Sequence, residues 1–195
     1  MSKNKQKRNE QQSRLDKGAA AGRRQEGIME ESQDISRLLN QAADLLQRGK
    51  PHEALPHLQQ AREIDPANTA VAINLGGAYV LLGRHKEAIP LLEYAASLEA
   101  QNAMLWTNLG AAYLGNPVLA SSKQQGQAIM AFERALELQP GLPNVNYNLG
   151  LIYRDQSKWA QAREQFERAL WVNPADRDAK MLLDRMAALL AENET

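Results

Sequence analysis

The sequence predicts an all-α protein, a right-handed α-solenoid of helix-turn-helix repeats closed by a C-terminal capping helix, and three observations support this prediction. Apolar residues recur at three- and four-residue intervals over most of the chain, as in amphipathic helices. Hydrophobic residues make up 44% of the chain but aromatic residues only 5%, which suits helices packed through alanine and leucine. A sequence pattern also returns at a regular spacing of about 34 residues, which is typical of repeat architectures.

The clearest copy of the repeat surrounds Gly110. Its residues form the pattern W-x2-L-G-x2-Y followed by A-x3-F, A and P, at Trp106, Leu109, Gly110, Tyr113, Ala128, Phe132, Ala135 and Pro140. The glycine recurs upstream at Gly76 and downstream at Gly150. The spacing from Gly76 to Gly110 equals that from Ala128 to Ala162, but the spacing from Gly110 to Gly150 is six residues longer. An insertion of six residues therefore lies between Tyr113 and Ala128.

This pattern resembles that of the tetratricopeptide repeat (TPR) family. The resemblance implies repeats at about 35–68, 69–102, 103–142 and 143–176, followed by a capping helix at about 175–191. In such an array, stacked helix pairs form a superhelix whose concave surface is lined by the first helix of each pair. We expect residues 31–195 to form the array.

Local signals mark the expected ends of the helices. Asp34 is a candidate N-cap of the first helix, and Gly49 and Gly83 are candidate stops in the left-handed conformation. Asn68 or Thr69 is expected to cap the second pair. The insertion, 115–121, is expected to form an irregular surface loop, and Ser122–Gln125 has the form of a capping box that restarts the helix.

Composition limits the classes of function. Without cysteine the chain has no disulfide or thiolate chemistry, and no apolar run approaches the length of a membrane span, so we expect a cytoplasmic protein. Phosphate-binding, nucleophile-elbow and zinc-protease motifs are missing, and His52, His57 and His85 are expected at the surface. We therefore predict no enzyme, no cofactor and no metal site.

Residues 1–30 form a basic arm that we expect to be disordered. Residues 1–24 carry eight lysines and arginines against two acidic residues, so their charge of +6 is balanced by −6 on the rest of the chain. The arm is either a solubilising tail or a contact for nucleic acid or an anionic surface, although no aromatic residue in it could stack on a base.

A row of asparagines suggests a binding surface. Asparagine occupies the same repeat position four times, and its amide can both donate and accept hydrogen bonds from an extended peptide backbone. The row resembles the asparagine ladders of peptide-binding TPR superhelices, although asparagines that bond only within the fold would give the same pattern. The candidate groove residues are Asn40, Asn74, Asn108, Asn148, Met104, Thr107, Asn144, Tyr147 and Leu151.

The groove departs from TPR domains that hold acidic C-termini through a lysine and arginine clamp. The corresponding positions hold Leu39, Ala43, Met104 and Asn108, none of which is charged. We therefore expect a neutral groove of small and apolar residues.

The tryptophans and the insertion carry further expectations. Trp106 and Trp159 are expected in the core. Trp171 either packs under the terminal helix, which we favour, or lies exposed. Val118 and Leu119 are apolar residues of the insertion that either touch a partner or fold back on the array.

The sequence thus predicts a non-catalytic interaction module or adaptor, a monomer or weak oligomer that binds an extended peptide of a protein partner. The alternative is a nucleic-acid- or ribosome-associated accessory protein that uses the basic arm.

Overall fold

The computed structural model describes residues 25, 27 and 29–193. The predicted basic arm lies almost entirely outside these residues. The described chain is helical, with short connections between the helices. After a first helix that covers 29–47, the helices are α2 (Pro51–Ile64), α3 (Thr69–Leu81), α4 (His85–Leu98), α5 (Ala103–Leu114), α6 (Ser122–Leu138), α7 (Val145–Asp155), α8 (Trp159–Val172) and α9 (Arg177–Asn193).

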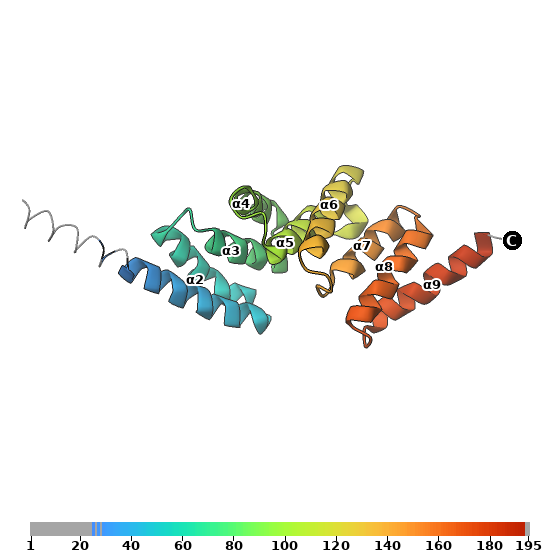
Figure 1. Ribbon diagram of the computed structural model, residues 1–195, viewed down its shortest axis with the longest axis horizontal. Helices are drawn as coiled ribbons and strands as arrows, with labels where there is room; N and C mark the ends of the chain where they lie inside the picture. Colours follow the sequence, from blue (N-terminus) through green and yellow to red (C-terminus); the bar gives the residue numbers. More distant parts are fainter. Residues whose placement is uncertain (1–24, 26, 28, 194–195) are drawn as a thin grey trace, which may run out of the picture.

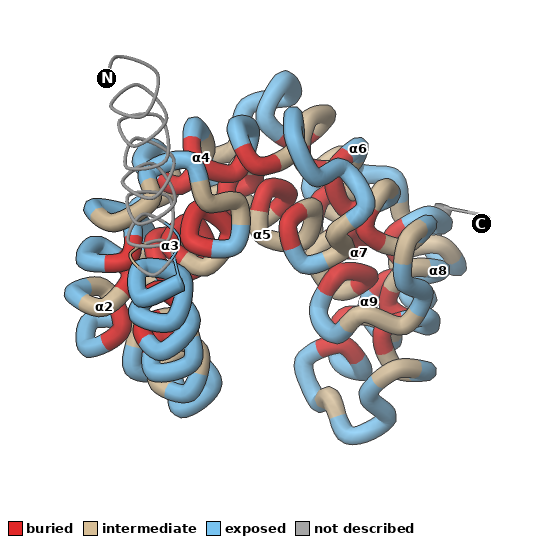
Figure 2. The backbone as a smooth tube through the Cα atoms, turned by 60° about the vertical axis from the view of Figure 1, so that its left-hand side comes forward, coloured by how far each residue is buried: buried red, intermediate tan, exposed pale blue. Residues whose placement is uncertain are grey.

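The helices follow one another along an elongated array, and consecutive helices form antiparallel pairs (Figure 1). In an oblique view of the array, the pairs build an arch (Figure 2). The first helix, α3, α5 and α7 lie toward the inside of the arch, and α2, α4, α6 and α8 lie toward its outside. This is the predicted all-α solenoid of helix pairs.

In the second, third and fourth pairs, a glycine within the first helix has no side chain, which lets the second helix approach closely. A Cβ atom on Gly76 would lie 2.6 Å from Cγ of Leu92, and one on Gly110 would lie 2.6 Å from the ring of Phe132. Gly150 faces the ring of Phe166 in the same way. At each of these three glycines, the leucine or phenylalanine of the repeat pattern therefore fills the space that a Cβ atom would occupy.

The core runs through the array because each pair leaves one apolar face for the next pair to cover. The largest cluster of buried residues extends through the first three pairs and includes Leu58, Leu75, Leu92 and Leu105, and a smaller one joins the first helix to α2 and α3. Further clusters join the third pair to the fourth and the fourth pair to α9. Leu182 and Met186 of α9 cover Phe166 of α8, so α9 closes the last open core as expected.

Most helix ends match the sequence signals, and two do not. Gly49 and Gly83 have φ angles of 69° and 70°, and Asn68 accepts a hydrogen bond from the backbone N–H of Val71. Asp34 is not an N-cap, because residues 29–33 are already helical. The capping box begins one residue earlier than predicted: Ser121 is the N-cap and Gln124 is its partner, whereas Ser122 is the first residue of α6.

The insertion lies where the sequence places it, between α5 and α6. It is more ordered than an irregular loop, since Asn116 accepts a hydrogen bond from the N–H of Val118 and starts a 3-10 turn, η1 (Pro117–Leu119). The turn contacts α7. The side chains of Val118 and Leu119 are nevertheless 77% and 78% exposed.

All three tryptophans are less buried than expected. Trp106 is only partly buried, although it packs against the main core and its indole N–H donates to the carbonyl oxygen of Ala100 at 2.8 Å. Trp159 is partly buried against the terminal core. The prediction for Trp171 was wrong: its side chain is 80% exposed, because α9 packs on the face of α8 that carries Phe166 and not on the position of Trp171.

Candidate peptide groove

The inner surface of the arch is electrically neutral at its centre. Helices α3 and α5 contain no lysine, arginine, aspartate, glutamate or histidine, and α7 carries charge only at Arg154 and Asp155, its last two residues. The outer helices cover one side of α3 and α5, and the opposite side of these two helices faces the inside of the arch (Figure 2). A ligand on this surface therefore meets uncharged side chains.

The four asparagines of the repeated position occupy the inner helices but differ in their contacts. Asn40 is exposed on the first helix, and Asn74, Asn108 and Asn148 are partly buried. The amide of Asn74 donates to the carbonyl oxygen of Ala70 at 2.8 Å, within its own helix. Among the described residues, Asn40, Asn108 and Asn148 form no hydrogen bond through their side chains. Three of the four amides are thus free to pair with a ligand.

Asn108 is positioned by a glycine that the sequence patterns did not single out. A Cβ atom on Gly77 would lie 2.8 Å from Nδ2 of Asn108, so the amide of α5 lies against the bare backbone of α3. Gly77 follows the repeat glycine Gly76 directly, and the equivalent residue of the next repeat is Ala111. The pair Gly76-Gly77 is the sequence signal that could have revealed the role of Gly77, because the packing of the helix pair requires only Gly76.

Met104 and Thr107 belong to the same face of α5 as Asn108. Met104 is 61% exposed, which is unusual for a large apolar side chain and offers a contact surface. Thr107 is partly buried, and its hydroxyl donates to the carbonyl oxygen of Ala103 at 3.0 Å. Thr107 therefore presents mainly its methyl group to the groove.

The residues predicted on α7 are less available than those on α5. Asn144 is the residue before the helix, exposed and in the left-handed conformation with φ 64°, and it makes no side-chain cap. Tyr147 and Leu151 pack against the terminal core, and the ring of Tyr147 meets that of Phe166 edge-on at 5.9 Å. Burial, followed by Asp178 and Asp176, raises the pKa of Tyr147. Of the residues predicted within α7, Asn148 is therefore more available to a ligand than Tyr147 and Leu151.

The histidines and the acidic residues of the described chain do not gather into a metal site. The described residues contain no cluster of three or more His, Asp or Glu side chains that could hold a metal ion. His52 is exposed, and His57 and His85 are partly buried on the outer helices. In the described part of the chain, no helix is both long enough and apolar enough to cross a membrane.

Two models of the tetratricopeptide repeat match the sequence, one over residues 45–93 and the other over residues 131–164. The chain is a tetratricopeptide-repeat protein. The first match covers α2, α3 and most of α4, and the second covers parts of the third and fourth TPR pairs on either side of the α6–α7 connection. No curated protein sequence matches the chain.

Solved structures share the fold of this TPR chain. PilF of Pseudomonas aeruginosa has a TM-score of 0.68 at 24% identity, over 83% of this chain and 71% of PilF. MamA of Desulfovibrio magneticus has a TM-score of 0.65 at 21% identity, over 83% of this chain and 88% of the MamA chain. Cut9, in a structure of an APC/C hetero-tetramer with Hcn1, has a TM-score of 0.67 at 23% identity but is covered over only 29% of its length. At these identities the likeness concerns the fold.

Proposed function

We propose that this TPR chain is a non-catalytic interaction module that binds an extended, uncharged peptide segment of a protein partner along the inside of its arch. The observation that carries the proposal is the combination of in-phase amides and a surface without charge on α3 and α5. Amides can pair with a peptide backbone whatever its side chains are, and an uncharged peptide on a neutral surface avoids the desolvation cost of burying charge.

The details of the amides support binding more than a purely structural role. Asparagine is a poor helix former, so its repetition within helices needs a compensating interaction. Asn74 finds such an interaction with Ala70, but Asn108 and Asn148 form none with the described protein. Gly77 leaves room for the amide of Asn108, which lies against the backbone of α3 and remains partly exposed.

The structural neighbours are consistent with this class of function. Cut9 was solved in a hetero-tetramer with Hcn1, which is a protein–protein assembly. TPR arrays present continuous concave surfaces suited to extended ligands. The identity of the partner has to come from experiment, because one fold serves many partners.

The test compares the full chain with the triple variant Asn74→Ala, Asn108→Ala and Asn148→Ala. The partner recovered with the full chain is titrated calorimetrically against both proteins. Alanine favours helix, so the variant should remain folded, while the loss of three hydrogen bonds of about 0.5–1.5 kcal/mol each should weaken binding by about one to three orders of magnitude.

A matched control replaces three exposed amides of the outer helices by alanine, at Gln59, Gln60 and Gln161. This control should bind as the unmodified chain does. A triple asparagine variant that unfolds at lower urea and binds its partner normally would show that the asparagines are structural.

Nucleic-acid association is the second candidate function, and the charge of +6 on residues 1–24 is the observation that favours it. Salt separates the two candidates. Binding through basic residues to phosphates weakens steeply as salt rises, whereas binding to the neutral inner surface should change little. A steep salt dependence for the recovered partner would therefore support the arm and not the groove.

A further inference from the structure

A second groove, of about 570 Å³, lies between α5 and α6 away from the inner asparagines. Trp106, Leu109 and Tyr113 of α5 form one side, and Met130 of α6, which is 72% exposed, lies on the other. Glu93 of α4 reaches its edge, because it accepts a hydrogen bond from the Tyr113 hydroxyl at 2.6 Å. The groove thus combines aromatic, thioether and carboxylate groups.

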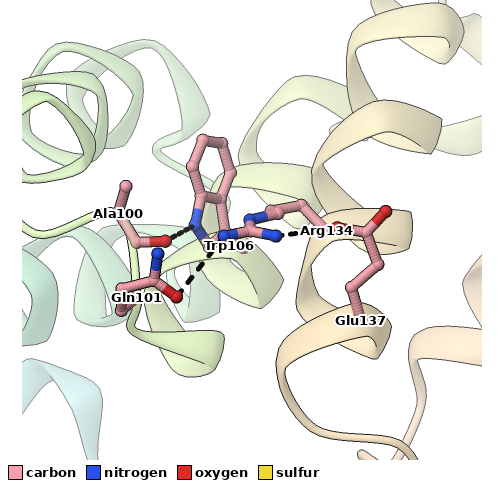
Figure 3. A network of polar contacts seen from close by, with 5 residues as sticks. All are labelled: Ala100, Gln101, Trp106, Arg134 and Glu137. Atoms are coloured by element: carbon pink, nitrogen blue, oxygen red, sulfur yellow. Dashed lines mark hydrogen bonds and ion pairs between the residues drawn. The ribbon is translucent and has the colours of Figure 1, made fainter.

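The two aromatic rings of this groove are fixed by their polar ends. The indole N–H of Trp106 donates to Ala100, and Arg134 of α6 lies beside the indole while pairing with Glu137 at 2.8 Å (Figure 3). The hydroxyl of Tyr113 is held by Glu93. Since both donors already have partners, what the rings offer a ligand is their carbon surface.

Tyr113 lacks a cation that lies over the ring of the equivalent tyrosine in the second and fourth repeats. The equivalent Tyr79 has the guanidinium of Arg84 at 4.4 Å from its ring centre. The equivalent Tyr153 has the ammonium of Lys158 at 5.8 Å from its ring centre. Both cations come five residues after their tyrosine.

Five residues after Tyr113 the chain holds Val118, within the insertion. Among the described residues, no cation lies over the ring of Tyr113. The insertion has therefore replaced a basic residue by an exposed apolar one at this position. An aromatic ring attracts a cation through its negative face, so the ring of Tyr113 can take one from elsewhere.

The charges around the groove favour a cation. Three carboxylates border it, at Glu93, Glu133 and Glu137, and one guanidinium, Arg134, is already paired with Glu137. Glu133 has no ion pair within the described chain. The neighbouring groove between α2 and α4 has a similar volume, about 560 Å³, but two cations, Arg62 and Lys86, against Glu87.

We propose that residues 1–24 of the same chain insert a lysine or arginine side chain into the α5–α6 groove, against Tyr113 and Glu133. The segment carries a charge of +6, and the remainder of the chain carries the opposite charge. Twenty-four residues can span up to about 80 Å when extended. The first helix and the helix layers up to α5 add up to a path on the order of 65 Å, so the segment is long enough.

Docking of this segment would cover Tyr113 and Met130 and neutralise the outer carboxylates. A polyanion would then compete with the groove for residues 1–24, and binding of these residues to the polyanion would uncover the groove. The inference is independent of what the inner asparagines bind.

The absence of cysteine makes a spin-label experiment direct, since Ser2→Cys gives the full chain one attachment site at the start of the basic segment, the part that can reach the groove. A nitroxide at this site broadens the NMR signals of nearby protons. Three indole N–H signals report on three places: Trp106 in the groove, and Trp159 and Trp171 outside it. Single Trp→Phe variants assign the signals.

The proposal predicts selective broadening of the Trp106 signal and little change for Trp171, although Trp171 is the most exposed of the three. Raised salt and the Glu133→Gln variant should both reduce the broadening. The matched variant Glu167→Gln, an exposed carboxylate of α8 paired with Arg163, should not. Unchanged signals at Trp159 and Trp171 confirm that each variant is folded.

Two results would overturn the proposal. Broadening that is strongest at Trp171, or equal at all three tryptophans, would show that the segment has no preferred site. Broadening of an isotope-labelled chain by spin-labelled chains that carry no isotope label would show that a second copy supplies the segment.

Discussion

Gly110 lies beneath the ring of Phe132, and this contact is the local reason for the repeat pattern. The glycine is needed because the ring occupies the space in which a Cβ atom would lie. The same relation holds between Gly76 and Leu92, and between Gly150 and Phe166. Gly126, in α6, has no such role, because a Cβ atom there would meet nothing within 4 Å.

Gly110 and Gly126 give a matched pair of substitutions. Gly110→Ala forces the ring of Phe132 to move, which should lower the free energy of unfolding by about 1–3 kcal/mol. Gly126→Ala should raise it by about 0.5–1 kcal/mol, since alanine is the better helix former and has room. Urea unfolding measures both. Equal effects of the two substitutions would refute the packing role of Gly110.

Tyr113 gives a prediction about pH. Burial, together with the hydrogen bond to Glu93, raises the pKa of Tyr113 from 10.0 to about 12. Between these values the folded chain keeps a proton that the unfolded chain releases, so the stability provided by this group is complete below pH 10.0 and is lost as pH rises toward about 12.

The Tyr113→Phe variant should therefore lose stability less steeply than the unmodified chain over this range of pH. Tyr147 and Tyr153, whose pKa values are also raised, remain in both proteins and provide a common background. Urea midpoints measured at several pH values give the two slopes. Parallel slopes would contradict the assignment.

At the scale of the element, the start of α6 is a feature that the sequence alone does not determine. The sequence after the insertion predicts a capping box, but two registers fit the motif. Ser121 and Ser122 are each followed three residues later by a glutamine. Only the backbone decides between them: Ser121 is extended, with φ −64° and ψ 158°, and its hydroxyl oxygen accepts a hydrogen bond from the N–H of Gln124. The sequence cannot distinguish these two registers.

Substitution of each serine tests the observed register. Ser121→Ala should lower the free energy of unfolding by about 1 kcal/mol, because it leaves a backbone N–H of α6 without a partner. Ser122→Ala, at the first helical residue, should change it by less than about 0.5 kcal/mol. Thermal or urea unfolding of both variants decides the matter, and a larger loss at Ser122 would restore the register predicted from sequence.

The first helix and Trp171 illustrate a different limit. Asp34 has the side chain of an N-cap, but helix continues on its N-terminal side, so a capping residue alone does not fix a helix boundary. The exposure of Trp171 depends on which face of α8 receives α9, and this is decided by contacts such as Phe166 with Met186. Such tertiary contacts are not encoded in the pattern of one repeat.

At the scale of the whole molecule, periodicity made the fold predictable, because every pair repeats the same contacts. The neutral inner surface was also predictable, since it follows from the composition of the first helices. The position of Asn108 against Gly77 and the missing cation at Tyr113 were not, because both depend on neighbouring repeats placed side by side.

Stacking predicts that damage to the array remains local at first. Met186 is buried in the terminal core, so Met186→Ala should cost about 2–5 kcal/mol in the stability of the last pair. Hydrogen exchange should accelerate in α8 and α9 before it does so in α3 and α4, because repeats interact mainly with their neighbours. Met181→Ala, at an exposed residue of α9, is the control and should leave exchange unchanged. Uniform acceleration in all helices would contradict this view.

The central claim is that the partner binds to the inside of the arch, and photo-crosslinking from one repeat tests it most directly. A photoreactive amino acid is placed at Met104 on α5 or at Met130 on α6, two exposed positions of the same helix pair. With the recovered partner bound, Met104 should crosslink to a short uncharged segment of the partner, whereas Met130 should not crosslink to the partner. Crosslinking of the partner from Met130 alone would contradict the claim.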